Sequence, residues 1–241
     1  MKAIILAAGR GSRMKKLTDE SPKCLVKIRG KTLLDWQLDA FKNAGISKIA
    51  VVTGYKRQLL ANRGLEEFYN ARWAETNMVS SLTCAGAWLM EGPCLVSYSD
   101  IYFCIRAVTL LMENPMPLAI TYDPNWLALW KRRFSNPLLD AETFRLNPDY
   151  TISEIGKKPK LIGEIQGQYM GLLRFEPEGW MELIRICAAL TAVESDRINM
   201  TSVLQKIVES GRLSIKAIPY VGEWGEVDSA NDLEAYNSGP T

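Results

Sequence analysis

Histidine is absent from the 241 residues of the sequence. Without it the protein has no Ser-His-Asp triad, no Cys-His dyad, no zinc site with histidine ligands and no phosphohistidine. Any catalysis must therefore depend on carboxylates, lysine, arginine, backbone N–H groups or a hard metal ion.

An excess of charge of one sign is also missing. The 29 lysine and arginine residues and the 27 aspartate and glutamate residues leave a net charge of +2, which indicates neither a nucleic-acid partner nor a membrane surface. No segment approaches the roughly 20 apolar residues that span a bilayer. The apolar start of the chain is too short for a signal peptide.

Cysteine is scarce, and its spacing forms no motif. There are five cysteines and no Cys-x-x-Cys pair, which argues against a zinc ribbon or a thioredoxin-like redox centre. An odd number without a disulfide framework is typical of a reducing compartment. We therefore expect a cytoplasmic protein.

Apolar runs alternate with segments of helical period, a pattern that predicts an α/β fold with a mostly parallel sheet. Lys2–Ala7 is a continuous apolar run, as expected for a strand covered on both faces. Thr32 can cap a helix that buries Leu34, Leu38 and Phe41. Further strands are expected at 48–53, 94–98, 118–122 and 214–219, and further helices at 78–90, 177–190, 199–209 and shortly after Asp228.

The middle of the chain differs in composition. From 123 to 160 it is rich in Trp, Pro, Asn and charge, and strands are expected at 142–146, 151–155 and 167–175 with a turn at 147–149. We predict a single domain, residues 1–241, with a small β-rich insertion at about 123–175 that covers one edge of the main sheet. An apolar patch near the insertion is compatible with a homodimer.

A glycine-rich loop follows the first predicted strand. Gly9 and Gly11 let the backbone turn and bring its N–H groups close to a ligand, where they can cradle phosphate oxygens. Arg13 suits bidentate phosphate binding and Lys23 adds a mobile point charge. The candidate nucleotide-binding residues here are Leu6, Ala7, Ala8, Gly9, Gly11, Ser12, Arg13 and Lys23.

Two other glycine motifs fit this loop poorly. A dinucleotide-binding loop needs a third glycine where this chain has Met14, and no segment matches the P-loop pattern. A nicotinamide-dependent oxidoreductase is therefore disfavoured. A tight turn with solvated basic residues is the remaining alternative from composition alone.

The run L-A-A-G-x-G-S-R-M, followed by Thr18 and by Pro22-Lys23, resembles the signature of the nucleotidyltransferase superfamily, which makes nucleoside-diphosphate sugars and alcohols. The resemblance implies a Rossmann-like, three-layer α/β/α fold of the GT-A-like type. It also implies that the first loop binds a nucleoside triphosphate and that Lys23 contacts its phosphates. Lys23 and Arg13 are the candidate catalytic residues, because their charges can offset that of the phosphates in the transition state.

Three acidic residues are candidate metal ligands. Asp100 follows an apolar strand, at the edge where open α/β sheets bind ligands, although an aspartate often simply ends a strand. Glu226 and Asp228 alternate, so in a strand they share a face, which is costly unless a cation or base lies between them. The run W-x-E-V-D-x-x-x-D-L resembles the C-terminal metal motif of the superfamily, which implies Mg²⁺ as cofactor. Asp232 is expected to begin a helix instead.

A second polar segment is a candidate nucleotide contact. Thr76, Asn77, Ser80 and Ser81 precede or begin a predicted helix and can touch base, ribose or phosphate, or Thr76 or Asn77 can simply cap that helix. The pattern N-M-V-x-S-L resembles the branch that contains phosphocholine cytidylyltransferases and relatives acting on phosphonates. That resemblance favours CTP over GTP or UTP.

The aromatic and basic cluster at 126–134 is a candidate acceptor site. Its rings can hold an ammonium group and its bases a carboxylate or phosphonate, or the segment is an amphipathic helix with packed Trp and solvated bases. The longer run W-L-x-L-W-x-x-R-F-x-N-P-L-x-D-A-E-T, with E-I-G-K-K and Q-Y-x-G-L, resembles cytidylyltransferases that act on 2-aminoethylphosphonate or on phosphorylated amino-acid-like acceptors. The candidate acceptor-binding residues are Trp126, Trp130, Arg133, Asp140, Glu142, Lys157 and Gln168.

These observations lead to one hypothesis. The protein is expected to be a Mg²⁺-dependent cytidylyltransferase that moves CMP from CTP to a small phosphonate or phosphate acceptor and releases pyrophosphate. The acceptor is expected to resemble 2-aminoethylphosphonate, a phosphorylated amino acid or phosphocholine, although the aromatic box of the choline enzymes is missing. The alternatives are a sugar-1-phosphate nucleotidyltransferase using GTP or UTP, and a non-catalytic nucleotide-binding regulator.

Overall fold

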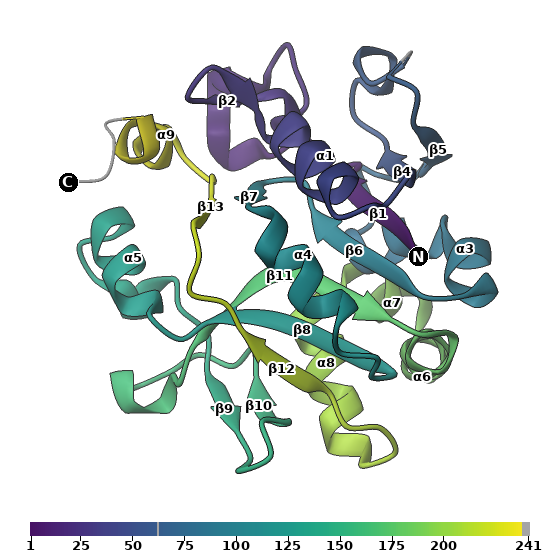
Figure 1. Ribbon diagram of the computed structural model, residues 1–241, viewed down its shortest axis with the longest axis vertical. Helices are drawn as coiled ribbons and strands as arrows, with labels where there is room; N and C mark the ends of the chain where they lie inside the picture. Colours follow the sequence, from purple (N-terminus) through teal and green to yellow (C-terminus); the bar gives the residue numbers. More distant parts are fainter. Residues whose placement is uncertain (62, 238–241) are drawn as a thin grey trace.

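A seven-stranded sheet with the order β12-β8-β11-β6-β1-β4-β5 forms the middle of the molecule (Figure 1). All neighbouring strands are parallel except β11, which runs antiparallel to both of its neighbours. This computed structural model describes residues 1–61 and 63–237, so residues 62 and 238–241 of the predicted domain lie outside it. The strands are β1 (Lys2–Ala7), β4 (Lys48–Thr53), β5 (Glu66–Tyr69), β6 (Cys94–Tyr98), β8 (Leu118–Asp123), β11 (Gln168–Phe175) and β12 (Lys216–Pro219).

Helices cover both faces of this sheet, which confirms the predicted three-layer α/β/α architecture. α1 (Leu33–Asn43) and α4 (Ile105–Met112) lie on the near face in Figure 1, and α8 (Met200–Ser210) lies on the far face and packs against α6 (Pro177–Ala188). No helix within the described residues is long and apolar enough to cross a membrane. The remaining helices outside the insertion are α2 (Met78–Thr83), α3 (Gly86–Glu91), α7 (Ala192–Arg197) and α9 (Ala230–Asn237), and a short β2 (Lys27–Ile28) pairs with β3 (Lys31–Thr32).

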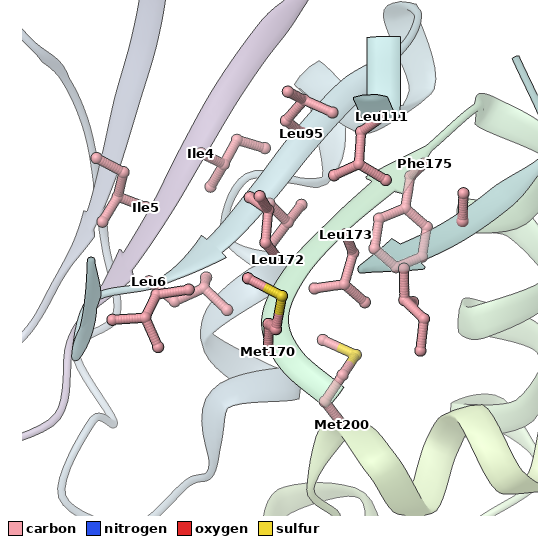
Figure 2. Close-up of a cluster of buried hydrophobic side chains, with 14 of the residues drawn as sticks. Ile4, Ile5, Leu6, Leu95, Leu111, Met170, Leu172, Leu173, Phe175 and Met200 are labelled. Atoms are coloured by element: carbon pink, nitrogen blue, oxygen red, sulfur yellow. The ribbon is translucent and has the colours of Figure 1, made fainter. Parts of the chain in front are cut away.

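The core is built from the continuous apolar strands. Ile4, Leu95 and Leu172, from the neighbouring strands β1, β6 and β11, are fully buried in one cluster that Met200 of α8 enters from below (Figure 2). Burying each such side chain contributes roughly 1.5–3 kcal/mol. The apolar pattern of β1 therefore fixes it at the centre of the sheet, with the glycine-rich loop at its carboxyl end.

The prediction of one helix over 78–90 is wrong, because the structure has two. The N–H groups of Cys84 and Ala85 donate to carbonyl oxygens three residues back, those of Ser81 and Leu82, so the turn tightens there. The next residue, Gly86, has low helix propensity and lies against the ring of Trp180. α3 then starts at Gly86.

The predicted insertion divides into two parts. α5 (Trp126–Arg133) and the two-stranded sheet of β9 (Phe144–Leu146) and β10 (Ile152–Ile155) form an addition at one end of the molecule (Figure 1). The last segment, β11, is instead a central strand of the main sheet, between β6 and β8. The β-rich addition therefore ends before residue 168.

A short strand pair that the sequence pattern did not predict joins the two halves of the chain. β7 (Ile101–Phe103) pairs antiparallel with β13 (Trp224–Glu226), and the Val227 N–H donates to the Asp100 carbonyl at 2.9 Å. Three-residue strands carry too little periodicity to be read from sequence. This pairing brings the end of the chain beside the end of β6.

α6 and α8 are joined by an ionic cluster around a buried acid. The Glu182 carboxylate accepts hydrogen bonds from Arg212 at 2.7 and 2.9 Å and from Arg185 at 2.6 Å, and one from Ser210 at 3.3 Å. The hydrogen bonds from Arg212 outweigh burial and hold the pKa of Glu182 below its ordinary value. The charged form of Glu182 is thus favoured in the folded state.

Replacing this acid tests its contribution. We expect Glu182→Gln to lower the free energy of unfolding at pH 7 by about 1–2 kcal/mol, because charge-assisted hydrogen bonds are lost. A lowered folded-state pKa gives stability that is present above the unfolded value of about 4.3 and is lost as the pH falls through the folded value. The difference from the wild type should therefore shrink below about pH 4 in urea titrations.

The matched control is Glu209→Gln, which changes an exposed acid on α8. It should change the free energy of unfolding by less than about 0.5 kcal/mol. Equal losses in the two variants at pH 7 would contradict the assigned role of Glu182.

Candidate active site

The glycine-rich loop turns back over Lys23. Gly11 has a φ of +71°, and a Cβ there would lie 2.9 Å from Cδ of Lys23, so only glycine allows both the turn and the close approach. The loop is held by the Thr18 hydroxyl, which donates to the Gly11 carbonyl at 3.1 Å. A cavity of about 260 Å³ opens in front of it. Of the loop residues predicted to bind nucleotide, Leu6, Ala8, Gly9, Gly11, Ser12, Arg13 and Lys23 line this cavity, whereas Ala7 is packed in the core.

Lys23 is a buried cation between two acids. Its side chain is only 7% exposed, and Nζ lies 2.8 Å from Oδ2 of Asp100 and 2.5 Å from Oδ1 of Asp228. Burial alone would lower the pKa of Lys23, but the charges of Asp100 and Asp228 outweigh it and raise the pKa. Lys23 is therefore protonated wherever this arrangement persists.

The three acids predicted as metal ligands meet at one point. One carboxylate oxygen each of Asp100, Glu226 and Asp228 lies within 4.8 Å of the others. The strand ends at Glu226, so the predicted alternation along one strand is replaced by the turn after β13. Burial, and then the charge of Asp228, raises the pKa of Glu226. Burial also opposes ionisation of Asp228, but Lys23 outweighs it and lowers the pKa of Asp228.

Arg133, predicted to contact the acceptor, is enclosed beneath this acidic centre. Its side chain is 0% exposed, and it reaches Glu226 at 3.0 Å, Asp232 at 2.9 Å and Asp228 at 3.5 Å. Asp232 also accepts hydrogen bonds from the N–H groups of Asp228 and Ser229, each at 2.9 Å, at the start of α9. Asp232 is thus a helix-start residue, as expected, and Arg133 positions the acids from below.

The second polar segment is fixed to α7. Asn77 caps α2 by accepting from the Met78 N–H at 2.7 Å, and its amide donates to the Arg197 carbonyl at 3.1 Å. Ser80 donates to the Ser195 carbonyl at 3.3 Å and does not line the cavity. Thr76, Asn77 and Ser81 do line it, together with Trp73, Met78 and Tyr98, which sequence reasoning missed.

A second cavity of about 220 Å³ adjoins the first. It reaches from the acidic centre to the β-rich insertion. Arg13, Met78, Tyr98 and Asp100 line both cavities. A molecule in one cavity can therefore meet a molecule in the other beside Asp100.

The predicted acceptor residues divide between this second cavity and the structure around it. Trp130, Asp140, Glu142 and Gln168 line the cavity. Trp126 is buried and donates to the Ile165 carbonyl at 3.2 Å, and Lys157 pairs with Glu154 at 3.2 Å, so neither residue lines it. The lining residues that sequence reasoning missed include Tyr98, Tyr169, Asn199 and Thr201.

Two of the missed residues, Met78 and Tyr169, lie within runs that carried a sequence signal, and Met78 belongs to the N-M-V-x-S-L pattern. Tyr169 belongs to the Q-Y-x-G-L run, where Gly171 adopts a φ of +81° against the ring of Tyr98. Asn199 and Thr201 come from the start of α8, where Asn199 caps the helix by accepting from Ser202. Because a capping residue is expected at any helix start, the sequence did not indicate that Asn199 also lines the second cavity.

Comparison with known proteins shows that this fold and site are those of a nucleotidyltransferase. Residues 3–139 match the model of the MobA-like NTP transferase domain. The chain belongs to this family, which confirms the resemblance seen in the glycine-rich loop.

Two relatives match along nearly their whole length. The chain is 38% identical to a CTP:phosphoglutamine cytidylyltransferase of Campylobacter jejuni, over 97% of this chain and 98% of that protein. It is 34% identical to a 2-aminoethylphosphonate cytidylyltransferase of Lancefieldella rimae, over 98% and 92%.

Solved structures support the fold. The CTP:phosphocholine cytidylyltransferase of Streptococcus pneumoniae superimposes with a TM-score of 0.72 at 20% identity, covering 98% of this chain and 97% of that one. The inositol-1-phosphate CTP transferase of T. maritima gives a TM-score of 0.75 at 19% identity, covering 98% and 94%. Both superpositions cover nearly the whole chain.

The buried guanidinium offers a direct test of how the acids are held. We expect Arg133→Met to lower the free energy of unfolding by about 3–5 kcal/mol, because it leaves buried carboxylates without their cation. The neighbouring Arg132→Met, an exposed position on the same helix, should change it by less than about 1 kcal/mol. Similar unfolding midpoints for the two variants in guanidinium chloride would show that Arg133 does not support the acidic centre.

Proposed function

We propose that the protein is a cytidylyltransferase that transfers CMP from CTP to a small acceptor carrying a phosphate or phosphonate group. The observation that carries this proposal is the pair of adjoining cavities that share Arg13 and Asp100. A nucleotide over the glycine-rich loop and an acceptor in the second cavity meet at that junction. The names of both near-full-length relatives support CTP as the donor.

The proposed reaction joins two anions. An acceptor oxygen attacks the α-phosphorus of CTP, the bond from that phosphorus to the oxygen bridging the α- and β-phosphates breaks, and pyrophosphate leaves with that electron pair. Neutralising the accumulating charge is the main requirement. Lys23 and Arg13 are the cations at the junction of the cavities. The acceptor oxygen is already ionised, so a histidine base is not needed.

We propose Mg²⁺ as the cofactor, held by Asp100, Asp228 and Glu226. The donors are all carboxylate oxygens, which hard divalent cations prefer. Oδ1 of Asp100 is buried and has no hydrogen-bond partner among the described residues, so one donor position is left open. When bound, the ion supplies positive charge to the phosphate oxygens of the reacting groups.

A cytoplasmic location fits this proposal. The structure describes Cys24, Cys84, Cys94, Cys104 and Cys187 as free thiols, as expected in a reducing compartment. A homodimer stays a prediction.

A nucleotide panel tests the proposal. With Mg²⁺ and an acceptor mixture of 2-aminoethylphosphonate, phosphoserine, phosphocholine, glycerol phosphate and hexose phosphates, we expect pyrophosphate release with CTP at least about tenfold faster than with UTP, GTP or ATP. A coupled pyrophosphate assay measures the rate. Removal of divalent ions with EDTA should abolish it and added Mg²⁺ should restore it.

Each alternative gives a different result in that panel. A sugar-1-phosphate enzyme would prefer UTP or GTP with hexose phosphates. A regulator would bind CTP and release no pyrophosphate with any acceptor. Either pattern would overturn the proposal.

Lys23 carries a second test. We expect Lys23→Ala to lower kcat by on the order of a hundredfold, as loss of one preorganised transition-state cation does. Circular dichroism and thermal melting check that the variant is folded, and Lys27→Ala, an exposed lysine four residues on, serves as the control. A folded Lys23→Ala enzyme with the wild-type rate would remove Lys23 from the mechanism.

A further inference from the structure

The buried face of α1, a helix that the structure describes in full, contains a single polar side chain, that of Gln37. Gln37 is 0% exposed, and its neighbours on this face, Leu33, Leu34 and Phe41, are fully buried as well. This face packs against β7 (Figure 1). Burying an amide costs free energy unless hydrogen bonds replace those to water. The hydrogen-bond partners of Gln37 therefore explain what an amide contributes here.

The amide of Gln37 spans the turn that carries Asp100. Its Nε2 donates to the carbonyl oxygen of Tyr98 at 2.8 Å and to that of Ile101 at 2.6 Å. Tyr98 is the last residue of β6 and Ile101 is the first residue of β7. Because both acceptors are carbonyl oxygens, only the NH2 end of the amide can face them. One side chain therefore uses both of its N–H donors to hold the two ends of the turn.

The opposite end of the same amide is unsatisfied. Oε1 of Gln37 is buried and accepts no hydrogen bond from the described residues. A buried acceptor without a donor destabilises the folded state. Methionine has a similar size and would avoid this cost. The stability of the fold alone therefore does not account for glutamine at this position.

The other contacts around Asp100 hold it less completely. Lys23 contacts the carboxylate, at 2.8 Å, and not the backbone of the turn. The Ser97 hydroxyl donates to the Tyr98 carbonyl at 3.0 Å, which is on the β6 side of the turn alone. Gln37 instead reaches the backbone on both sides of Asp100 and attaches it to a helix in the core.

We infer that Gln37 is a positioning residue for the acidic centre: by holding the turn from α1, it keeps the carboxylate of Asp100 in place to bind the same divalent cation as Glu226 and Asp228. The carboxylate oxygens of these acids lie within 4.8 Å of one another. A cation binds several oxygens only where they meet at the distance that the ion requires. Groups that orient metal ligands therefore change the affinity for the ion. The inference rests on the proposed function for the presence of a cation, and not on the choice of nucleotide or acceptor.

Replacing the amide tests this inference. Gln37→Met keeps the approximate size of the side chain and removes both N–H donors. We titrate the metal-free protein with Mn²⁺, which suits carboxylate sites as Mg²⁺ does, and follow the unbound ion by electron paramagnetic resonance. The Kd for Mn²⁺ should rise about tenfold or more. A general loss of stability would lower the unfolding temperature without changing the Kd of the folded protein.

The dependence of the reaction on Mg²⁺ gives a second readout. In the pyrophosphate assay, the Mg²⁺ concentration that gives half of the maximal rate should rise about tenfold in Gln37→Met. The KM for CTP at saturating Mg²⁺ should change by less than about twofold, because the glycine-rich loop is intact.

The matched control is Gln205→Met on α8. Oε1 of Gln205 accepts from the Ile155 N–H at 2.8 Å, so this substitution also removes a hydrogen bond between a helix side chain and the backbone of another segment. It should leave the Kd for Mn²⁺ at the wild-type value. If thermal melting shows that Gln37→Met is not folded, Gln37→Asn replaces it. Its shorter amide cannot reach both carbonyls, and the same rise in Kd is expected.

Three results would overturn the inference: a wild-type Kd for Mn²⁺ in a folded Gln37 variant, an equal rise in Gln205→Met, or no binding of Mn²⁺ by the wild type. Failure of the proposed function is a separate result. If the wild-type protein releases no pyrophosphate with CTP and any acceptor, the Mn²⁺ titration still decides whether Gln37 positions Asp100.

Discussion

Charge balance at the meeting point of Asp100, Glu226 and Asp228 is the constraint on which the site depends. Carboxylate oxygens within 4.8 Å of one another repel strongly when they are partly removed from water. Lys23, beneath the glycine-rich loop, opposes this repulsion, and Arg133 opposes it from the insertion. These cations come from different parts of the chain. The ion pairs that offset the repulsion between the acids therefore also join the loop, the insertion and the C-terminal segment.

This constraint explains why the irregular parts of the fold lie where they do. The central strands are stabilised by the burial of apolar side chains. The short antiparallel pair of β7 and β13 instead brings Asp100 and Glu226 close together. Because Gly11 has no side chain, the side chain of Lys23 can lie directly beneath the loop. The backbone conformation of Gly11 and the charges of the lysine and arginine side chains therefore together hold the acids close to one another beside the cavity in front of the loop.

The sequence predicted the elements whose signal is local. Lys2–Ala7 and Cys94–Tyr98 are continuous apolar runs, and they form adjacent central strands. The pairing of β7 with β13 joins segments more than a hundred residues apart, and no window of sequence contains both. The site follows the same division: family motifs identified Lys23 and the acids, but the true surroundings of Arg133 depend on partners that only the folded chain assembles.

The acceptor side of the site is where sequence reasoning was weakest, and the reason is physical. The nucleotide side is built on the ends of β1 and β6, whose positions follow from core packing. The acceptor side combines the insertion, β11 and the first residues of α8, and side chains such as Gln168 and Thr201 link these segments by hydrogen bonds to Glu142. Because such contacts add little to the stability of the fold, they can be exchanged without disturbing the sheet. The acceptor side can therefore change without altering the strands β1 and β6 on which the nucleotide side is built.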